Sequence, residues 1–323
     1  MKTIDNLISK KNKETRLFTP GPGSLMKENI IGLRPCFGRN DLKYSKIEKF
    51  VLNRITKMSG QKKTVSIQGS GSLAIEIMCY NFLYGNVTII KTGYYSDRLN
   101  FICKNLKKIR RIKKIQYLDY RKIEKIDKNS DWVFYCPTET SIGLHIPIKE
   151  IWKLTKKNNT KLMLDATASI GLEKDHSLAD VLSFSSCKGL FGLTGAGFIS
   201  YKIKPRYFEK SFYLNLLSHE NKKMTGPYHT ICSLFYVLKN YQKIKKSVFI
   251  NKKNCIKKME NNLFYPPKNQ PKLCTRVNKK LRTKNKNVIL YKSRSKIEGS
   301  VINHLGELHL KERAKAKILD LIF

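Results

Sequence analysis

Short apolar segments recur through the first two hundred residues of this chain, and helical patterns of apolar residues lie between several of them. Strands that alternate with helices favour a mostly parallel, doubly wound α/β sheet. In such a sheet, ligands bind beyond the carboxyl ends of the strands. The predicted strands cover 65–67, 87–91, 115–118, 132–135, 161–164, 181–185 and 197–201, and the predicted helices cover 44–59, 73–82 and 148–157.

The character of the sequence changes near residue 230. A long helix is predicted over 231–240, and the lysine-rich remainder carries a weak strand pattern over 287–291 and a terminal helix over 311–322. We therefore expect a large domain with an N-terminal segment over 1–235, and a shortened, atypical α+β domain over 236–323. A chain of 323 residues is long enough for one large domain and one small one.

The chain is strongly basic, with 64 Lys and Arg against 24 Asp and Glu and a net charge of +40. Such a charge suits a polyanion such as nucleic acid. However, the basic residues lie along most of the chain, and no RNP, KH or zinc-finger signature occurs. A nucleic-acid partner is therefore possible but not favoured over solvated lysines. The dense run at 107–114 is either a basic surface patch or a helix end that leads into a strand.

The cysteines and the apolar runs bear on the cellular compartment. Eight cysteines are scattered without a CxxC pair, which indicates neither a zinc site nor a disulfide framework. No apolar run approaches the roughly 20 residues of a membrane span, and the first 14 residues lack the apolar core of a signal peptide. We expect a cytoplasmic protein without a metal.

A lysine and an aspartate are the most informative candidates for chemistry. Lys188 follows two serines and a cysteine, and Asp165 ends a predicted strand. A lysine amine can hold a carbonyl compound as a Schiff base, and pyridoxal phosphate needs an acidic partner for its ring nitrogen. Alone the pair is weak evidence, because a lysine is usually solvated and a strand-end aspartate serves equally well as a helix cap or turn residue.

Other polar residues follow the predicted strands. Gly69–Ser72 can cradle a phosphate, since glycines admit the backbone N–H groups and a helix N-terminus favours an anion. Tyr95 can stack on a cofactor ring, Thr140 can bond the ring's phenolic oxygen, and Thr167 would lie against the ring face. The alternatives are a common small-residue turn, an ordinary half-buried tyrosine, and hydroxyls that stabilise turns.

The order of the motifs resembles a known family. The chain reads TPGP from Thr19, GSGS from Gly69, TGYYSDR from Thr92, ETSIG from Glu139, DATASIG from Asp165 and SSCKGLFGLTGAGF from Ser185. This order is similar to the class V aminotransferases of the pyridoxal-phosphate fold type I. Within them it is most similar to the 2-aminoethylphosphonate:pyruvate transaminases.

The resemblance implies roles for individual residues. Lys188 would form the internal aldimine and act as general base, and Asp165 would pair with the pyridinium nitrogen. The phosphate would be bound by Ser70, Gly71 and Ser72, with Tyr95 stacked on the ring and Thr140 near the ring oxygen. Thr225, in Met224–Pro227, would reach the phosphate of the neighbouring subunit, which implies a homodimer with shared active sites.

One family feature is missing. The C-terminal domain of the family supplies an arginine that binds the substrate carboxylate or phosphonate, and the aligned position here is Val301. Arg294, Arg34 or Arg39 could take over anion binding, although the resemblance indicates none of them.

The expected function is transfer of an amino group to a keto acid such as pyruvate. The donor would be a small amine that is 2-aminoethylphosphonate-like, or alanine or serine. Two alternatives stay open: a lyase or desulfurase-like enzyme of the same fold, and a degenerate protein of this fold that acts as a basic binding module without turnover.

Overall fold

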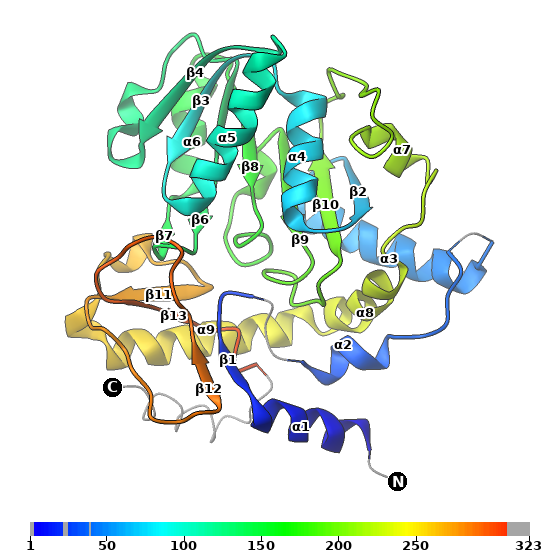
Figure 1. Ribbon diagram of the computed structural model, residues 1–323, viewed down its shortest axis with the longest axis vertical. Helices are drawn as coiled ribbons and strands as arrows, with labels where there is room; N and C mark the ends of the chain where they lie inside the picture. The colour runs from blue at the N-terminus through cyan, green and yellow to red at the C-terminus, as the bar shows by residue number, and fades with distance from the viewer. Residues whose placement is uncertain (1–2, 22–24, 39, 309–323) are drawn as a thin grey trace.

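The computed structural model describes residues 3–21, 25–38 and 40–308, and a seven-stranded sheet forms its centre (Figure 1). Strand β10 runs antiparallel to both of its neighbours, and the remaining strand pairs are parallel. The expected mostly parallel α/β sheet is therefore confirmed. The strands in spatial order are β2 (Lys63–Gln68), β10 (Ala196–Tyr201), β9 (Val181–Ser185), β8 (Lys161–Asp165), β5 (Trp132–Tyr135), β3 (Gly85–Lys91) and β4 (Ile112–Asp119).

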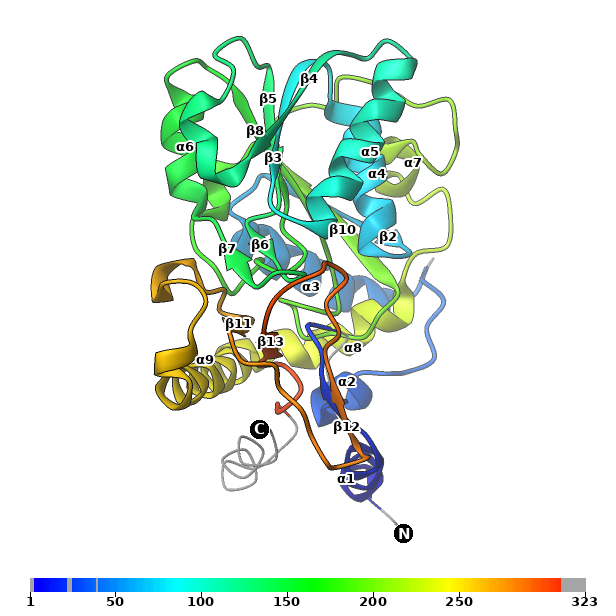
Figure 2. The same ribbon diagram turned by 60° about the vertical axis from the view of Figure 1, so that its left-hand side comes forward.

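Helices cover both faces of this sheet. Strand β5 illustrates the reason, because Trp132 and Phe134 pack into one apolar core while Val133 and Tyr135 pack into the other. Side chains alternate across a strand, so a strand that is apolar throughout must be buried on both sides. Figure 2 shows α4 and α5 on one side of the sheet and α6 on the other. One core receives α4 (Gly71–Phe82), α5 (Tyr94–Lys108) and α7 (Leu216–Glu220), and the other receives α3 (Leu42–Ser59), α6 (Ile148–Lys156) and α8 (Tyr228–Lys239).

Helix α5 was absent from the sequence-based prediction. Its buried residues Leu99, Ile102, Cys103 and Leu106 have helical spacing, but the exposed lysines around them obscure the pattern. The basic run at 107–114 spans the end of α5 and the start of β4. It is thus the helix end that leads into a strand, and its lysines are exposed.

The C-terminal part is built on a long helix that the sequence did not reveal, α9 (Tyr241–Lys258). An antiparallel pair, β11 (Cys274–Val277) and β13 (Ser300–Asn303), packs on it through Cys255 and Ile302. The weak strand pattern is confirmed as β12 (Val288–Leu290). The predicted terminal helix over 311–322 lies outside the described residues.

The N-terminal segment meets the C-terminal part. Strand β1 (Arg16–Phe18) follows α1 (Ile4–Glu14) and precedes α2 (Lys27–Ile31) in the chain. It pairs in parallel with β12 (Figure 1). The division of the chain at 235/236 stays a prediction. A further short pair, β6 (Thr138–Glu139) and β7 (Leu144–His145), forms a tight loop beyond the end of β5.

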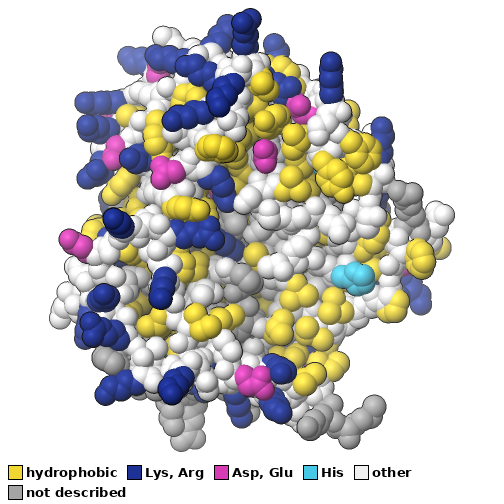
Figure 3. Space-filling view, viewed as in Figure 1, with side chains coloured by type: hydrophobic (Ala, Val, Ile, Leu, Met, Phe, Trp, Pro, Cys, Tyr) yellow, Lys and Arg dark blue, Asp and Glu magenta, His cyan; other side chains and the backbone are white. Residues whose placement is uncertain are grey.

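The surface is basic over wide areas. Figure 3 shows Lys and Arg side chains spread over the upper and left-hand parts of one face, with few acidic side chains between them.

All eight cysteines are free. Within the described part of the chain, every helix is either too short or too polar to cross a membrane.

Candidate active site

A cavity of about 380 Å³ opens at the ends of the central strands and gathers residues from most of the motifs. Every residue that the sequence indicated for the cofactor lines it, apart from Thr225. These residues are Ser70, Gly71, Ser72, Tyr95, Thr140, Asp165, Thr167 and Lys188. They come from loops and helix ends that follow β2, β3, β5, β8 and β9, which explains why residues far apart in the sequence meet here.

The N-terminus of α4 forms one wall of this cavity. Ser70 is the N-cap, and its side chain accepts a hydrogen bond from the Leu73 N–H at 3.2 Å. A Cβ atom on Gly71 would lie 3.0 Å from the Ser185 Cβ, so glycine lets the helix start close to β9. The unpaired N–H groups and the positive end of the helix dipole at this position suit an anion such as a phosphate.

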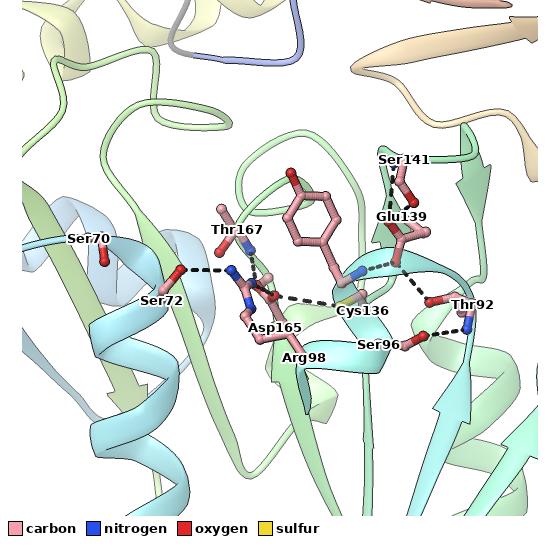
Figure 4. Close-up of polar contacts among 12 residues, drawn as sticks. Ser70, Ser72, Thr92, Ser96, Arg98, Cys136, Glu139, Ser141, Asp165 and Thr167 are labelled. Carbon is pink, nitrogen blue, oxygen red and sulfur yellow. Dashed lines mark hydrogen bonds and ion pairs between the residues drawn. The ribbon is translucent and has the colours of Figure 1, made fainter. Parts of the chain in front are cut away.

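Asp165 lies at the floor of the cavity with only 4% of its side chain exposed. Its Oδ1 accepts the Thr167 N–H at 3.1 Å, and its Oδ2 accepts from Arg98 at 3.1 Å and from the Cys136 thiol at 3.6 Å (Figure 4). Burial raises the pKa of the Cys136 thiol well above its ordinary value. A carboxylate has about four acceptor positions, so Asp165 has room for a further donor.

Arg98 connects three parts of the site. Besides its ion pair with Asp165, it donates to the Ser72 Oγ at 2.7 Å, and its guanidinium lies 5.1 Å from the centre of the Tyr95 ring. The sequence reasoning assigned Arg98 no role. Spacing supplies the signal that was missed, because residues 95 and 98 are three apart on α5 and therefore lie on one face.

Glu139 fixes the position of Tyr95, whose ring forms a second wall of the cavity, here called the tyrosine wall. This carboxylate is fully buried, and it accepts hydrogen bonds from the Tyr95 N–H at 3.1 Å and from the Thr92 hydroxyl at 3.3 Å. It also accepts from both the N–H and the hydroxyl of Ser141 (Figure 4). Burial raises the pKa of Glu139, and the bonds from Ser141 and Tyr95 oppose that rise. No pattern in the sequence indicates that a carboxylate is buried here.

Lys188 extends from the loop after β9 toward the tyrosine wall, with its Nζ 4.9 Å from the centre of the Tyr95 ring. Gly21, in the TPGP segment, packs against its stem. A Cβ on Gly21 would lie 2.7 Å from the Lys188 Cγ, and the φ of Gly21 is +132°. The glycine of this motif is therefore required by a close approach. Pro22, the last residue of the motif, lies outside the described residues.

Three hydroxyls that line the cavity have no hydrogen-bond partner within the described structure, those of Thr138, Thr140 and Thr167. Buried polar groups are normally paired. Three such hydroxyls in one cavity therefore indicate a polar ligand. Together with a helix N-terminus, an aromatic ring, a buried carboxylate and a lysine amine, this donor set fits pyridoxal 5'-phosphate.

Thr225 does not lie in this cavity. It lines a separate hollow of about 260 Å³ with Gly38 and Gln68. When the Gln68 amide is oriented so that both its oxygen and its nitrogen have suitable hydrogen-bond partners, the nitrogen donates to the Thr225 backbone oxygen at 2.8 Å. Within one chain, Thr225 thus does not line the cavity that holds the other candidate residues.

Position 301 holds no anion-binding side chain. Val301 is buried in β13, directly opposite Arg276 of β11. Of the other arginines considered, Arg294 lines the cavity, Arg34 does not, and Arg39 lies outside the described residues.

Comparisons with known proteins agree with this architecture. Residues 52–211 match the family model "Aminotransferase class-V". Over 197 residues the chain is 26% identical to a 2-aminoethylphosphonate–pyruvate transaminase of Pseudomonas aeruginosa, with 57% of this chain and 53% of that protein covered. It is also 28% identical over 198 residues to a bifunctional phosphonoacetaldehyde hydrolase/aminoethylphosphonate transaminase of Clostridioides difficile, with 57% and 31% covered. The match thus spans about half or less of these relatives.

Solved structures share the fold over nearly the whole chain. An aspartate aminotransferase of subgroup IV from Thermus thermophilus superposes with a TM-score of 0.78 at 15% identity, covering 94% of this chain and 97% of that one. A pyridoxamine–pyruvate aminotransferase from Mesorhizobium loti also gives 0.78, at 17% identity, covering 94% and 90%. The fold is therefore that of the fold type I aminotransferases. Through residues 52–211, this chain belongs to the class-V aminotransferase family.

Proposed function

We propose that this protein is a pyridoxal-phosphate-dependent aminotransferase that moves an amino group from a small amino donor to a keto acid such as pyruvate. The observation that carries the proposal is the single cavity shared by Lys188, Asp165 and the N-terminus of α4. The names of the sequence relatives support 2-aminoethylphosphonate or a similar compound as the donor. The comparisons lend no support to a lyase or to a basic binding module.

Each part of the cavity would have its own task. The N–H groups at the start of α4, with Ser70 and Ser72, would bind the cofactor phosphate, and Asp165 would hold the ring nitrogen in its protonated form. When bound, the cofactor supplies an electron sink for the pair that remains when a proton leaves the donor. The amine of Lys188 would accept that proton and return it as a general acid.

We also propose that two copies of the chain share their active sites. Thr225 of the partner subunit would then complete the phosphate site, which is supported by the position of Thr225 outside its own chain's cavity. Exposed apolar residues lie near this second hollow: Phe37 is 88% exposed and precedes Gly38, and Leu42 is 77% exposed and starts α3. Such residues would be covered by a second copy.

The cofactor proposal is tested by chemical trapping. The purified protein is incubated with pyridoxal 5'-phosphate, treated with borohydride and digested, and the labelled peptide is found by mass spectrometry. We expect the label on Lys188, because this is the cavity's lysine amine. Lys188→Ala should abolish it, whereas Lys202→Ala, outside the cavity, should keep it. A label spread over surface lysines would contradict the proposal.

The transfer itself is followed by the visible absorption of the loaded protein. Addition of 2-aminoethylphosphonate, alanine or serine should change that absorption, and pyruvate should restore it. A protein that takes up the cofactor on Lys188 but responds to none of these donors would not be a transaminase for this class of substrate.

A further inference from the structure

The cavity needs a group that binds the acid function of an amino donor, and position 301 does not provide it. Val301 is buried, and the arginine opposite it in β11, Arg276, points to other partners. The Arg276 guanidinium lies 3.5 Å from the centre of the Phe264 ring and donates to the Tyr265 hydroxyl at 3.1 Å. It also donates to the backbone oxygens of Ile142 and Glu298. Arg276 is also buried and does not line the cavity, so its guanidinium is not presented to a ligand there.

Among the described residues, two arginines line the cavity. Arg98 already has Asp165 and Ser72 as partners. Arg294 forms no ion pair with any carboxylate in the described parts of the chain. Its guanidinium lies 5.1 Å from the centre of the Tyr94 ring and donates one hydrogen bond, at 3.2 Å, to the Tyr94 hydroxyl. A guanidinium has five N–H donors, so most of those of Arg294 are available.

The backbone around Arg294 is held at the edge of the cavity from both sides. The preceding residue, Ser293, donates its hydroxyl to the Ser141 backbone oxygen, and the following residue, Ser295, donates to the Ser141 Oγ at 3.1 Å. Ser141 is in turn bound by the buried Glu139, which also holds the Tyr95 N–H. One buried carboxylate thus positions both the tyrosine wall and the loop that carries Arg294.

We propose that Arg294 binds the acidic group of the amino donor, in place of the arginine that is absent at position 301. The ligand class is a small amine with a carboxylate or phosphonate, because a planar guanidinium binds both types of oxyanion with two parallel hydrogen bonds. Tyr94 orients the guanidinium by stacking and through its hydroxyl. This assignment rests on the proposed aminotransferase function and deepens it by naming the residue that selects the substrate.

The test separates anion binding from turnover. Cofactor-loaded wild type, Arg294→Gln and Arg294→Lys are titrated calorimetrically with ethylphosphonate and with propionate, which carry the acid group but no amine. We expect Arg294→Gln to lower the affinity for the anion that the wild type prefers at least tenfold, and Arg294→Lys to lower it less. Arg282→Gln, an exposed site outside the cavity, removes the same charge and should bind as the wild type does.

A kinetic measurement complements the titration. With 2-aminoethylphosphonate or alanine as donor and pyruvate as acceptor, Arg294→Gln should raise the KM for the donor much more than it lowers kcat, while cofactor affinity stays within about twofold of wild type. Equal anion affinity in wild type and Arg294→Gln would overturn the assignment. So would a loaded wild type that binds neither anion. Failure of the proposed function is recognised separately, by a protein in which borohydride places no label on Lys188.

Discussion

Gly21 and Lys188 are in contact although they lie far apart in the sequence, and their contact leads to a prediction for a single residue. In Gly21→Ala, the new Cβ would lie 2.7 Å from the Lys188 Cγ and 2.8 Å from the Cys187 carbonyl oxygen, at a φ of +132°. We expect Lys188 to be displaced and cofactor affinity to fall at least tenfold. Backbone strain should lower the free energy of unfolding by about 1–3 kcal/mol.

Cofactor affinity is measured by fluorescence titration and stability by urea unfolding. Gly60→Ala is the matched control, because Gly60 also has a positive φ, +65°, and its Cβ would lie 2.4 Å from the Ser177 Cβ, but it does not line the cavity. It should lose stability and keep its cofactor affinity. Normal affinity in Gly21→Ala would show that this contact does not position Lys188.

At the scale of elements, the start of α4 combines a structural task with a proposed binding task. Ser70 caps α4 by accepting from the Leu73 N–H, and Asp41 caps α3 in the same way by accepting from the Tyr44 N–H at 2.9 Å. Replacing either residue with alanine should lower the free energy of unfolding by about 1 kcal/mol. Only Ser70→Ala should also weaken binding of the cofactor phosphate, because of these two helices α4 begins at the cavity and α3 does not.

The two variants are compared by urea unfolding and by titration with inorganic phosphate and with pyridoxal 5'-phosphate. Asp41→Ala controls for a general loss of stability. If both variants lost phosphate affinity equally, the effect would come from destabilisation, and the N-terminus of α4 would not be the phosphate site.

At the scale of the whole molecule, shared active sites predict complementation between two inactive variants. Lys188→Ala lacks the amine and Thr225→Ala lacks the hydroxyl offered to the partner. In a mixed dimer, one cavity would contain Lys188 from one chain and Thr225 from the other, so mixing should restore part of the activity. A mixture no more active than its two components would argue against sharing.

The interface proposed near Phe37 is tested by light scattering after gel filtration. Phe37→Asp should shift the protein toward the monomer and lower its affinity for the cofactor, because a charge replaces an apolar contact surface. Phe101→Asp, at a 65% exposed position on α5, introduces the same charge elsewhere and should leave the mass unchanged.

The strands of the central sheet, most of the helices that pack on it and the loops that carry the candidate cofactor site could be predicted from the sequence alone. These features are local, because alternating burial and helical periodicity are written into neighbouring residues. The candidate residues could be found for the same reason, since each follows a strand whose carboxyl end reaches the same edge of the sheet. Lysine-rich stretches hid α5 and α9, because long exposed cations interrupt the apolar pattern without disturbing the helix.

Which polar groups meet depends on the three-dimensional fold. The pairing of Arg98 with Asp165, the approach of Gly21 to Lys188 and the position of Arg294 beside Tyr94 join segments that lie far apart in the chain. No local pattern encodes these contacts, because they depend on the order of the strands and on how the C-terminal loop packs on Ser141. The residues on the cofactor side of the candidate site could therefore be predicted from sequence motifs. On the substrate side, the choice of Arg294 among the candidate arginines required the fold.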